Sequence, residues 1–105
     1  MSASDERLDE LIRRVVDSVH PLRIILFGSA ARGEARENSD IDVLVVVPDG
    51  THRRKTAQQI YMNLIGLGSS VDVVVATPSD LERYGNSPGL IYREIMKEGK
   101  ELYAA

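Results

Sequence analysis

The sequence contains no cysteine and only two histidines, His20 and His52, which lie far apart in the chain. Disulfide bonds and thiolate metal sites are therefore excluded, and the histidines are too few and too scattered for a zinc site. Any metal that this chain binds must be held by oxygen ligands.

Long apolar runs are also absent. None approaches the roughly 20 residues of a membrane-spanning helix, and the acidic, polar N-terminal segment is not a signal peptide. We therefore expect a cytoplasmic protein without membrane contact. Thirteen basic against sixteen acidic residues give a net charge of −3. This balance argues against direct binding of long nucleic acids, which depends on neutralising phosphates.

Helical and strand patterns alternate along the 105 residues, which we expect to form a single domain over residues 1–105. Apolar spacing of three and four predicts helices, and short β-branched runs predict strands. The predicted helices cover residues 4–20, 51–67 and 90–98, with another beginning at Thr77-Pro78 and a start signal at Ser87-Pro88. The predicted strands cover residues 22–27, 41–47 and 71–76. This order indicates an α/β fold with a small mixed β-sheet covered by helices.

Three aspartates stand in or beside the second and third predicted strands. Asp40 and Asp42 are two residues apart, so their carboxylates lie on one face of the second strand, roughly 7 Å apart. Asp72 lies inside the third strand, where an unpaired charge would be costly. If the two strands are neighbours, the three carboxylates can converge. An oxygen-only cluster of this kind suits Mg²⁺ that is shared with substrate phosphates.

A Gly28-Ser29 turn directly follows the first predicted strand. Glycine lets the backbone approach a phosphate closely, and the serine hydroxyl and the next amides can face an anion. Arg32, one turn further on, can reach the same phosphates. Each feature alone is common in ordinary turns and strand ends. Their joint occurrence in this order favours a site for a nucleoside triphosphate with Mg²⁺.

The joined pattern resembles a known family. Residues 28–33 (GSAARG), residues 39–45 (SDIDVLV) and the later Asp72 are similar to the DNA polymerase beta-type nucleotidyltransferase superfamily. The closer resemblance is to its minimal branch, the MNT antitoxins paired with HEPN-domain toxins. This resemblance implies a polymerase beta-like nucleotidyltransferase fold.

The resemblance also implies roles for particular residues. Gly28 and Ser29 would hold the triphosphate of ATP, with Arg32 and Ser39 in the nucleotide-binding set. The catalytic residues would be Asp40, Asp42 and Asp72, which would also bind two Mg²⁺ ions. Whether Asp72 or water removes the proton of the acceptor hydroxyl stays open.

The activity implied is transfer of AMP from ATP to a tyrosine hydroxyl of a cognate HEPN ribonuclease toxin, which neutralises the toxin. Larger relatives carry a further domain that grips the acceptor, so a hetero-oligomer with the toxin is expected. One alternative is an antitoxin that acts by covering its partner, with little catalysis. A less favoured one is a transferase for small molecules of the aminoglycoside type. The number of AMP groups and the base preference stay open.

A basic cluster, His52-Arg53-Arg54-Lys55, opens the second long predicted helix. Positive charge at a helix N-terminus is disfavoured by the helix dipole. The cluster is either a solvated helix end, or it lies near the carboxylates of the second strand and meets phosphates or an acidic partner.

Overall fold

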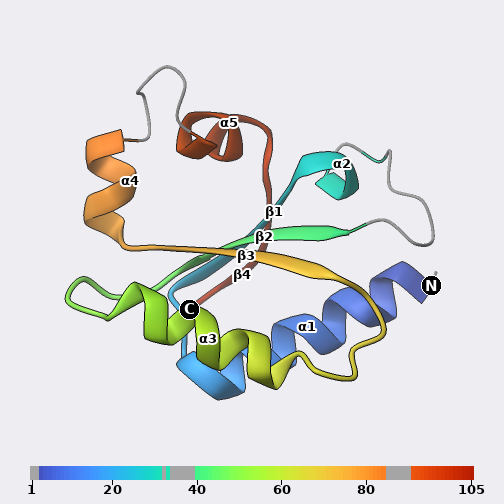
Figure 1. Cartoon of the computed structure of the whole chain (residues 1–105). Coiled ribbons are helices and arrows are strands. Elements are labelled where there is room, and N and C mark those ends of the chain that lie inside the picture. Colours follow the sequence, from blue (N-terminus) through green and yellow to red (C-terminus); the bar gives the residue numbers. More distant parts are fainter. Residues whose placement is uncertain (1–2, 32, 34–39, 85–90) are drawn as a thin grey trace.

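A four-stranded sheet forms the centre of the molecule, which the computed structural model describes over residues 3–31, 33, 40–84 and 91–105 (Figure 1). The strands are β1 (Arg23–Phe27), β2 (Ile41–Val46), β3 (Val71–Ala76) and β4 (Lys100–Ala104). They lie in the order β3-β2-β1-β4. β2 is parallel to β3 and antiparallel to β1, and β1 is antiparallel to β4. The predicted mixed sheet is confirmed.

Helices cover both faces of this sheet (Figure 1). α1 (Ala3–Val19) and α3 (Arg53–Asn63) pack on one face, and α4 (Pro78–Tyr84) and α5 (Ile91–Glu98) lie on the other. The single-turn α2 (Gly28–Ala31) follows β1 directly. Successive strand residues point to opposite faces, so Ile24 joins the core under α1 and α3 while Ile25 joins the core under α5. Among the described helices, none has both the length and the apolar character to cross a membrane.

Except for the second long helix, the predicted elements agree with the structure to within about one residue at the ends that the structure describes. The first helix stops at Val19, because the following Pro21 disfavours helical geometry at His20, whose φ is +48°. The bounds of β3 are those predicted, and β1 and β2 are each one residue shorter than predicted. The helix start predicted at Ser87-Pro88 lies outside the described residues.

The second long helix is shorter than predicted. It begins after His52, whose Nδ1 accepts a hydrogen bond of 3.2 Å from the Lys55 amide, and it ends at Asn63. Apolar residues continue the helical spacing to Leu67, but Gly66 and Gly68 adopt φ values of +88° and +90°, which end helical geometry. The turn at Gly66 and Gly68 therefore prevents the helix from continuing to Leu67, although the apolar spacing does.

The last strand, β4, is not predicted from the sequence, because it is short and opens with the exposed pair Lys100 and Glu101. Gly99 lies between it and α5. Its amide donates a hydrogen bond of 2.8 Å to the Ile95 carbonyl oxygen, and a Cβ there would lie 2.5 Å from that oxygen. Glycine thus lets the chain leave α5 close to the sheet and add β4 beside β1.

The helix start predicted at Thr77-Pro78 is confirmed, and Thr77 caps α4. The Asp80 amide donates to Thr77 Oγ1 over 3.3 Å, and the Thr77 amide donates to Asp80 Oδ2 over 3.0 Å. Arg53 also donates to Asp80 Oδ2, at 2.7 Å. Burial raises the pKa of Asp80, but the hydrogen bonds from Thr77 and Arg53 outweigh burial, so this pKa lies below its usual value.

We expect Asp80→Asn to lower the free energy of unfolding at pH 7 by roughly 1 kcal/mol, because the carboxylate accepts two charge-strengthened hydrogen bonds. A carboxylate with a lowered pKa stabilises the fold above the ordinary carboxyl pKa, and this contribution is lost as the pH falls through the lowered value. The difference between wild type and variant should therefore shrink in urea titrations at progressively lower pH. Glu82→Gln, exposed on the same helix, is the control. A difference independent of pH would contradict the assignment.

Candidate functional site

Two of the predicted site aspartates lie side by side. In the parallel pairing of β2 with β3, Asp42 is the register partner of Asp72, so both side chains project from the same face of the sheet. Leu44 and Val46 point to the same face of β2 as Asp42, and they pack in the core under α5. This is therefore the face that carries α4 and α5. The second and third predicted strands are therefore neighbours, as convergence of the carboxylates requires.

Burial and the neighbouring carboxylates raise the pKa of Asp42. Burial is the largest cause, followed by the charge of Asp72, a hydrogen bond between the Asp42 and Asp72 carboxyl groups, and the charge of Asp40. Asp40 is exposed and lies two residues before Asp42, just outside β2. The three carboxylates therefore act on one another, with Asp42 at the centre.

A divalent cation suits this donor set, because a cation would relieve the repulsion that raises the pKa of Asp42, and only oxygen ligands are present. Within the described part of the chain, no three acidic or histidine side chains are already arranged around a common metal position. Asp42 and Asp72 form a close pair, and Asp40 contributes through its charge.

Gly28, the first residue of α2, lies against Asp42. Its φ of +73° is a conformation that L residues rarely adopt, and a Cβ on Gly28 would overlap Asp42 Oδ2. The sequence suggests glycine here for a bound phosphate, and the structure adds the contact with Asp42 as a second reason. Ser29 follows at the start of α2 and is half-buried. Its role as a phosphate ligand stays a prediction, while Arg32 and Ser39 lie outside the described residues.

Phe27 is a neighbour of the Asp42–Asp72 pair that is not among the site residues predicted from the sequence. Phe27 is the register partner of Asp42 on β1, and it packs on the face with α4 and α5. The row across the sheet is thus Phe27, Asp42 and Asp72. In the sequence, Phe27 is marked as the last strand residue before Gly28. The phosphate-binding pattern does not include this position.

The basic cluster 52–55 does not lie beside these aspartates. The aspartates flank the start of β2, whereas α3 begins after the far end of that strand, six residues or about 20 Å away. Arg53 instead binds Asp80. The interpretation that the cluster meets the phosphates near the carboxylates is therefore wrong, because the chain runs the whole length of β2 before reaching it. Contact with an acidic partner stays open.

Comparison with known proteins places this arrangement in a family. Residues 8–102, from the first helix to the last strand, match the nucleotidyltransferase domain. The chain belongs to the nucleotidyltransferase domain family.

Individual relatives agree with this assignment. A Methanocaldococcus jannaschii protein named as a candidate protein adenylyltransferase is 34% identical over 89 residues, covering 80% of this chain and 59% of that protein. This chain thus spans about three fifths of that relative's length. A solved toxin-antitoxin complex with AMP-PNP contains a chain 26% identical, with a TM-score of 0.65 over 93% of this nucleotidyltransferase and 73% of that chain. A candidate minimal nucleotidyltransferase is 30% identical, with a TM-score of 0.61 and coverage of 91% and 89%.

The contact between Gly28 and Asp42 predicts that Gly28→Ala destabilises this nucleotidyltransferase domain more than Gly50→Ala does. Both glycines have positive φ, so both variants strain the backbone, by about 1–3 kcal/mol. Only at Gly28 would the new methyl group meet another side chain, because nothing lies within 4 Å of the corresponding position at Gly50.

Urea denaturation of the two variants measures this difference. Adding Asp42→Ala to Gly28→Ala should recover the extra loss, since the overlapping carboxylate is then gone. Equal losses for the two glycine variants would contradict a specific contact with Asp42.

Proposed function

We propose that residues 1–105 act as a single minimal nucleotidyltransferase domain that transfers AMP from ATP to a tyrosine hydroxyl of a HEPN ribonuclease toxin, and so serves as its antitoxin. The observation that carries the proposal is the register pair of Asp42 and Asp72 beside the Gly28-Ser29 turn. Membership of the nucleotidyltransferase family supports the reaction class. A relative named as a protein adenylyltransferase and a neighbour solved as a toxin-antitoxin complex with AMP-PNP support the protein acceptor and the nucleotide.

In this proposal each site residue has a role that follows from its position. Gly28 and Ser29, with Arg32 and Ser39, bind the triphosphate of ATP. Asp40, Asp42 and Asp72 hold Mg²⁺, which when bound neutralises phosphate charge and lowers the pKa of the attacking hydroxyl. Asp72 is exposed on the edge strand β3, so an incoming acceptor can reach its carboxylate.

The transfer itself is a displacement at the α-phosphorus. The tyrosine oxygen forms a bond to this phosphorus, and the bond to the bridging oxygen between the α- and β-phosphates breaks. Pyrophosphate leaves with the electron pair, and either Asp72 or water accepts the proton of the tyrosine hydroxyl. The negative charge gained on tyrosine would impair a surface that binds RNA phosphates.

The crowded carboxylates predict how Mg²⁺ and pH change stability. Repulsion penalises the charged form of Asp42, so in EDTA at neutral pH Asp42→Asn should unfold at a higher urea concentration than wild type. The penalty applies above the ordinary carboxyl pKa and disappears as the pH falls through the raised pKa of Asp42, so this advantage should vanish in acid.

Adding Mg²⁺ at neutral pH should stabilise wild type and leave Asp42→Asn nearly unchanged, because a cation bound only to the folded state raises its stability. Asp9→Asn, exposed on α1, should respond like wild type. Equal stabilisation of wild type and Asp42→Asn by Mg²⁺ would exclude Asp42 as a metal ligand.

AMP transfer is tested by incubating the purified chain with ATP, Mg²⁺ and the HEPN protein encoded beside it, followed by intact-mass measurement. We expect a mass gain of one or more AMP groups on a tyrosine of the HEPN protein. Asp42→Ala and Asp72→Ala should each lower the rate by about 100-fold or more, since even outer-shell partners of a metal are worth roughly 10- to 100-fold. Asp9→Ala is the matched control.

A mass gain that survives in Asp42→Ala would sink the catalytic assignment. Protection of cells by a variant with both Asp40 and Asp42 changed to alanine would favour the alternative, in which the antitoxin acts by covering its partner. Saturable pyrophosphate release with aminoglycosides and no protein acceptor would favour a small-molecule transferase.

A further inference from the structure

Helix α3 is apolar on two opposite sides. Its inner side, with Ile60 and Leu64, is buried in the core. On its outer side Tyr61, Met62 and Ile65 are 44%, 72% and 76% exposed. Burying side chains as large as Met and Ile is worth about 1.5–3 kcal/mol each, so three adjacent exposed ones leave a gain that a partner could realise by covering them. We call Arg54, Lys55, Gln58, Tyr61, Met62 and Ile65 the outer α3 surface.

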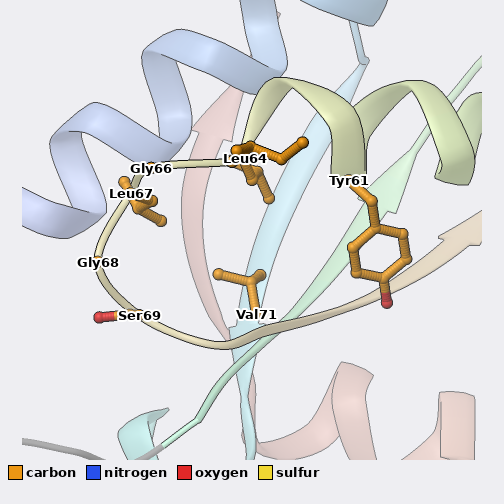
Figure 2. A pocket seen from close by; sticks show the side chains of 8 residues that line it. Tyr61, Leu64, Gly66, Leu67, Gly68, Ser69 and Val71 are labelled. Carbon is orange, nitrogen blue, oxygen red and sulfur yellow. The ribbon is translucent and has the colours of Figure 1, made fainter.

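A hollow adjoins this surface. It lies between the end of α3 and the edge strand β3, has a volume of about 280 Å³, and is lined by Tyr61, Leu64, Leu67 and Val71 (Figure 2). It is smaller than the cavities that usually hold drug-sized ligands, and its lining side chains are mostly apolar. A hollow of this size and character suits one apolar side chain of a protein.

The neighbouring strand edge is partly closed to strand addition. β3 is the outermost strand of the sheet on this side, and an open edge would offer its amides to another strand. The Val73 amide, however, donates a hydrogen bond of 2.8 Å to the Tyr61 hydroxyl. This amide is therefore occupied and cannot pair with an added strand, which favours a docked helix at this point of the edge.

The other end of the outer α3 surface is positively charged. Arg54 and Lys55 are exposed, and neither forms an ion pair with any described residue, in contrast to Arg53 beside them. Helical spacing places Arg54, Gln58 and Met62 on one side of the helix, and Ile65 lies two residues beyond its end. The positive end of the helix dipole adds to the same charge. A partner helix that complements this surface would carry acidic residues two to three helical turns away from its apolar residues.

We propose that the outer α3 surface docks an amphipathic helix of the acceptor protein, with an apolar side chain in the hollow and acidic residues against Arg54 and Lys55. This inference rests on the proposed function for the identity of the partner. Val71 lines the hollow, and the adjacent Asp72 points to the opposite face of the same edge strand. A protein held at this edge is therefore within reach of Asp72, which gives the acceptor tyrosine a path to the site around β3.

The test measures binding separately from catalysis. Ile65→Glu and Met62→Glu place charge on exposed positions of the outer α3 surface, and Met96→Glu, 42% exposed on α5 on the other face, is the matched control. Binding of the HEPN protein encoded beside the chain is followed by calorimetry, and AMP-PNP binding is followed in parallel. We expect the two α3 variants to weaken HEPN binding by 10-fold or more, with AMP-PNP binding unchanged and Met96→Glu like wild type.

Reversal of both Arg54 and Lys55 to glutamate should slow association and reduce its dependence on salt, because exposed charges act mainly on the rate of encounter. Wild-type affinity in the two α3 variants would overturn the proposal, as would dimerisation of the chain through this surface. Loss of binding in these variants, together with no AMP transfer by wild type, would keep the surface and reject the proposed reaction.

Discussion

The parallel pairing of β2 with β3 is the constraint on which the candidate site depends. It makes Asp42 and Asp72 register partners, and it does so on the face where Gly28 lies against Asp42. A shift of one residue would move Asp72 to the other face, because side chains alternate along a strand. Val71 and Val73, on either side of Asp72, pack with the core under α1 and α3, and Val74 packs with the core under α5. A shift of one residue would exchange these faces, so the packing opposes it.

The same pairing creates a cost in the folded protein. Burial and the carboxylates of Asp72 and Asp40 raise the pKa of Asp42, so the charged form of Asp42 is less favourable in the folded state at neutral pH. The rest of the fold supplies the stability that tolerates this cost, through a buried core on each face of the sheet. Such an unfavourable pair within a well-packed frame is typical of a functional site.

Helix α3 connects the two surfaces of interest. Its buried side, with Ile60 and Leu64, closes the core over the sheet, and its Tyr61 hydroxyl binds the edge strand that carries Asp72. The outer side of the same helix leaves Met62 and Ile65 in solvent. A helix that served only the core would carry polar residues at these outer positions. The outer residues of α3 belong to the surface that we propose docks the acceptor protein.

The sequence by itself determined the class of ligands and most of the elements. With no cysteine and two separated histidines, only oxygen can hold a metal, and the periods of two and about four residues locate three strands and the main helices. These features are local, so they can be read from neighbouring residues. The resemblance carried by residues 28–45 and Asp72 likewise led to the family that the comparison confirms.

Only the tertiary structure decided which of these elements meet. Three contacts join residues that are distant in the sequence. They are the register of Asp42 with Asp72, the contact between Gly28 and Asp42, and the hydrogen bond from the Val73 amide to the Tyr61 hydroxyl. The position of the basic cluster at the far end of β2, and the addition of β4, depend in the same way on the path of the whole chain. Periodicity assigns a residue to a face of its own element, but strand order and register follow from how all the faces are buried together.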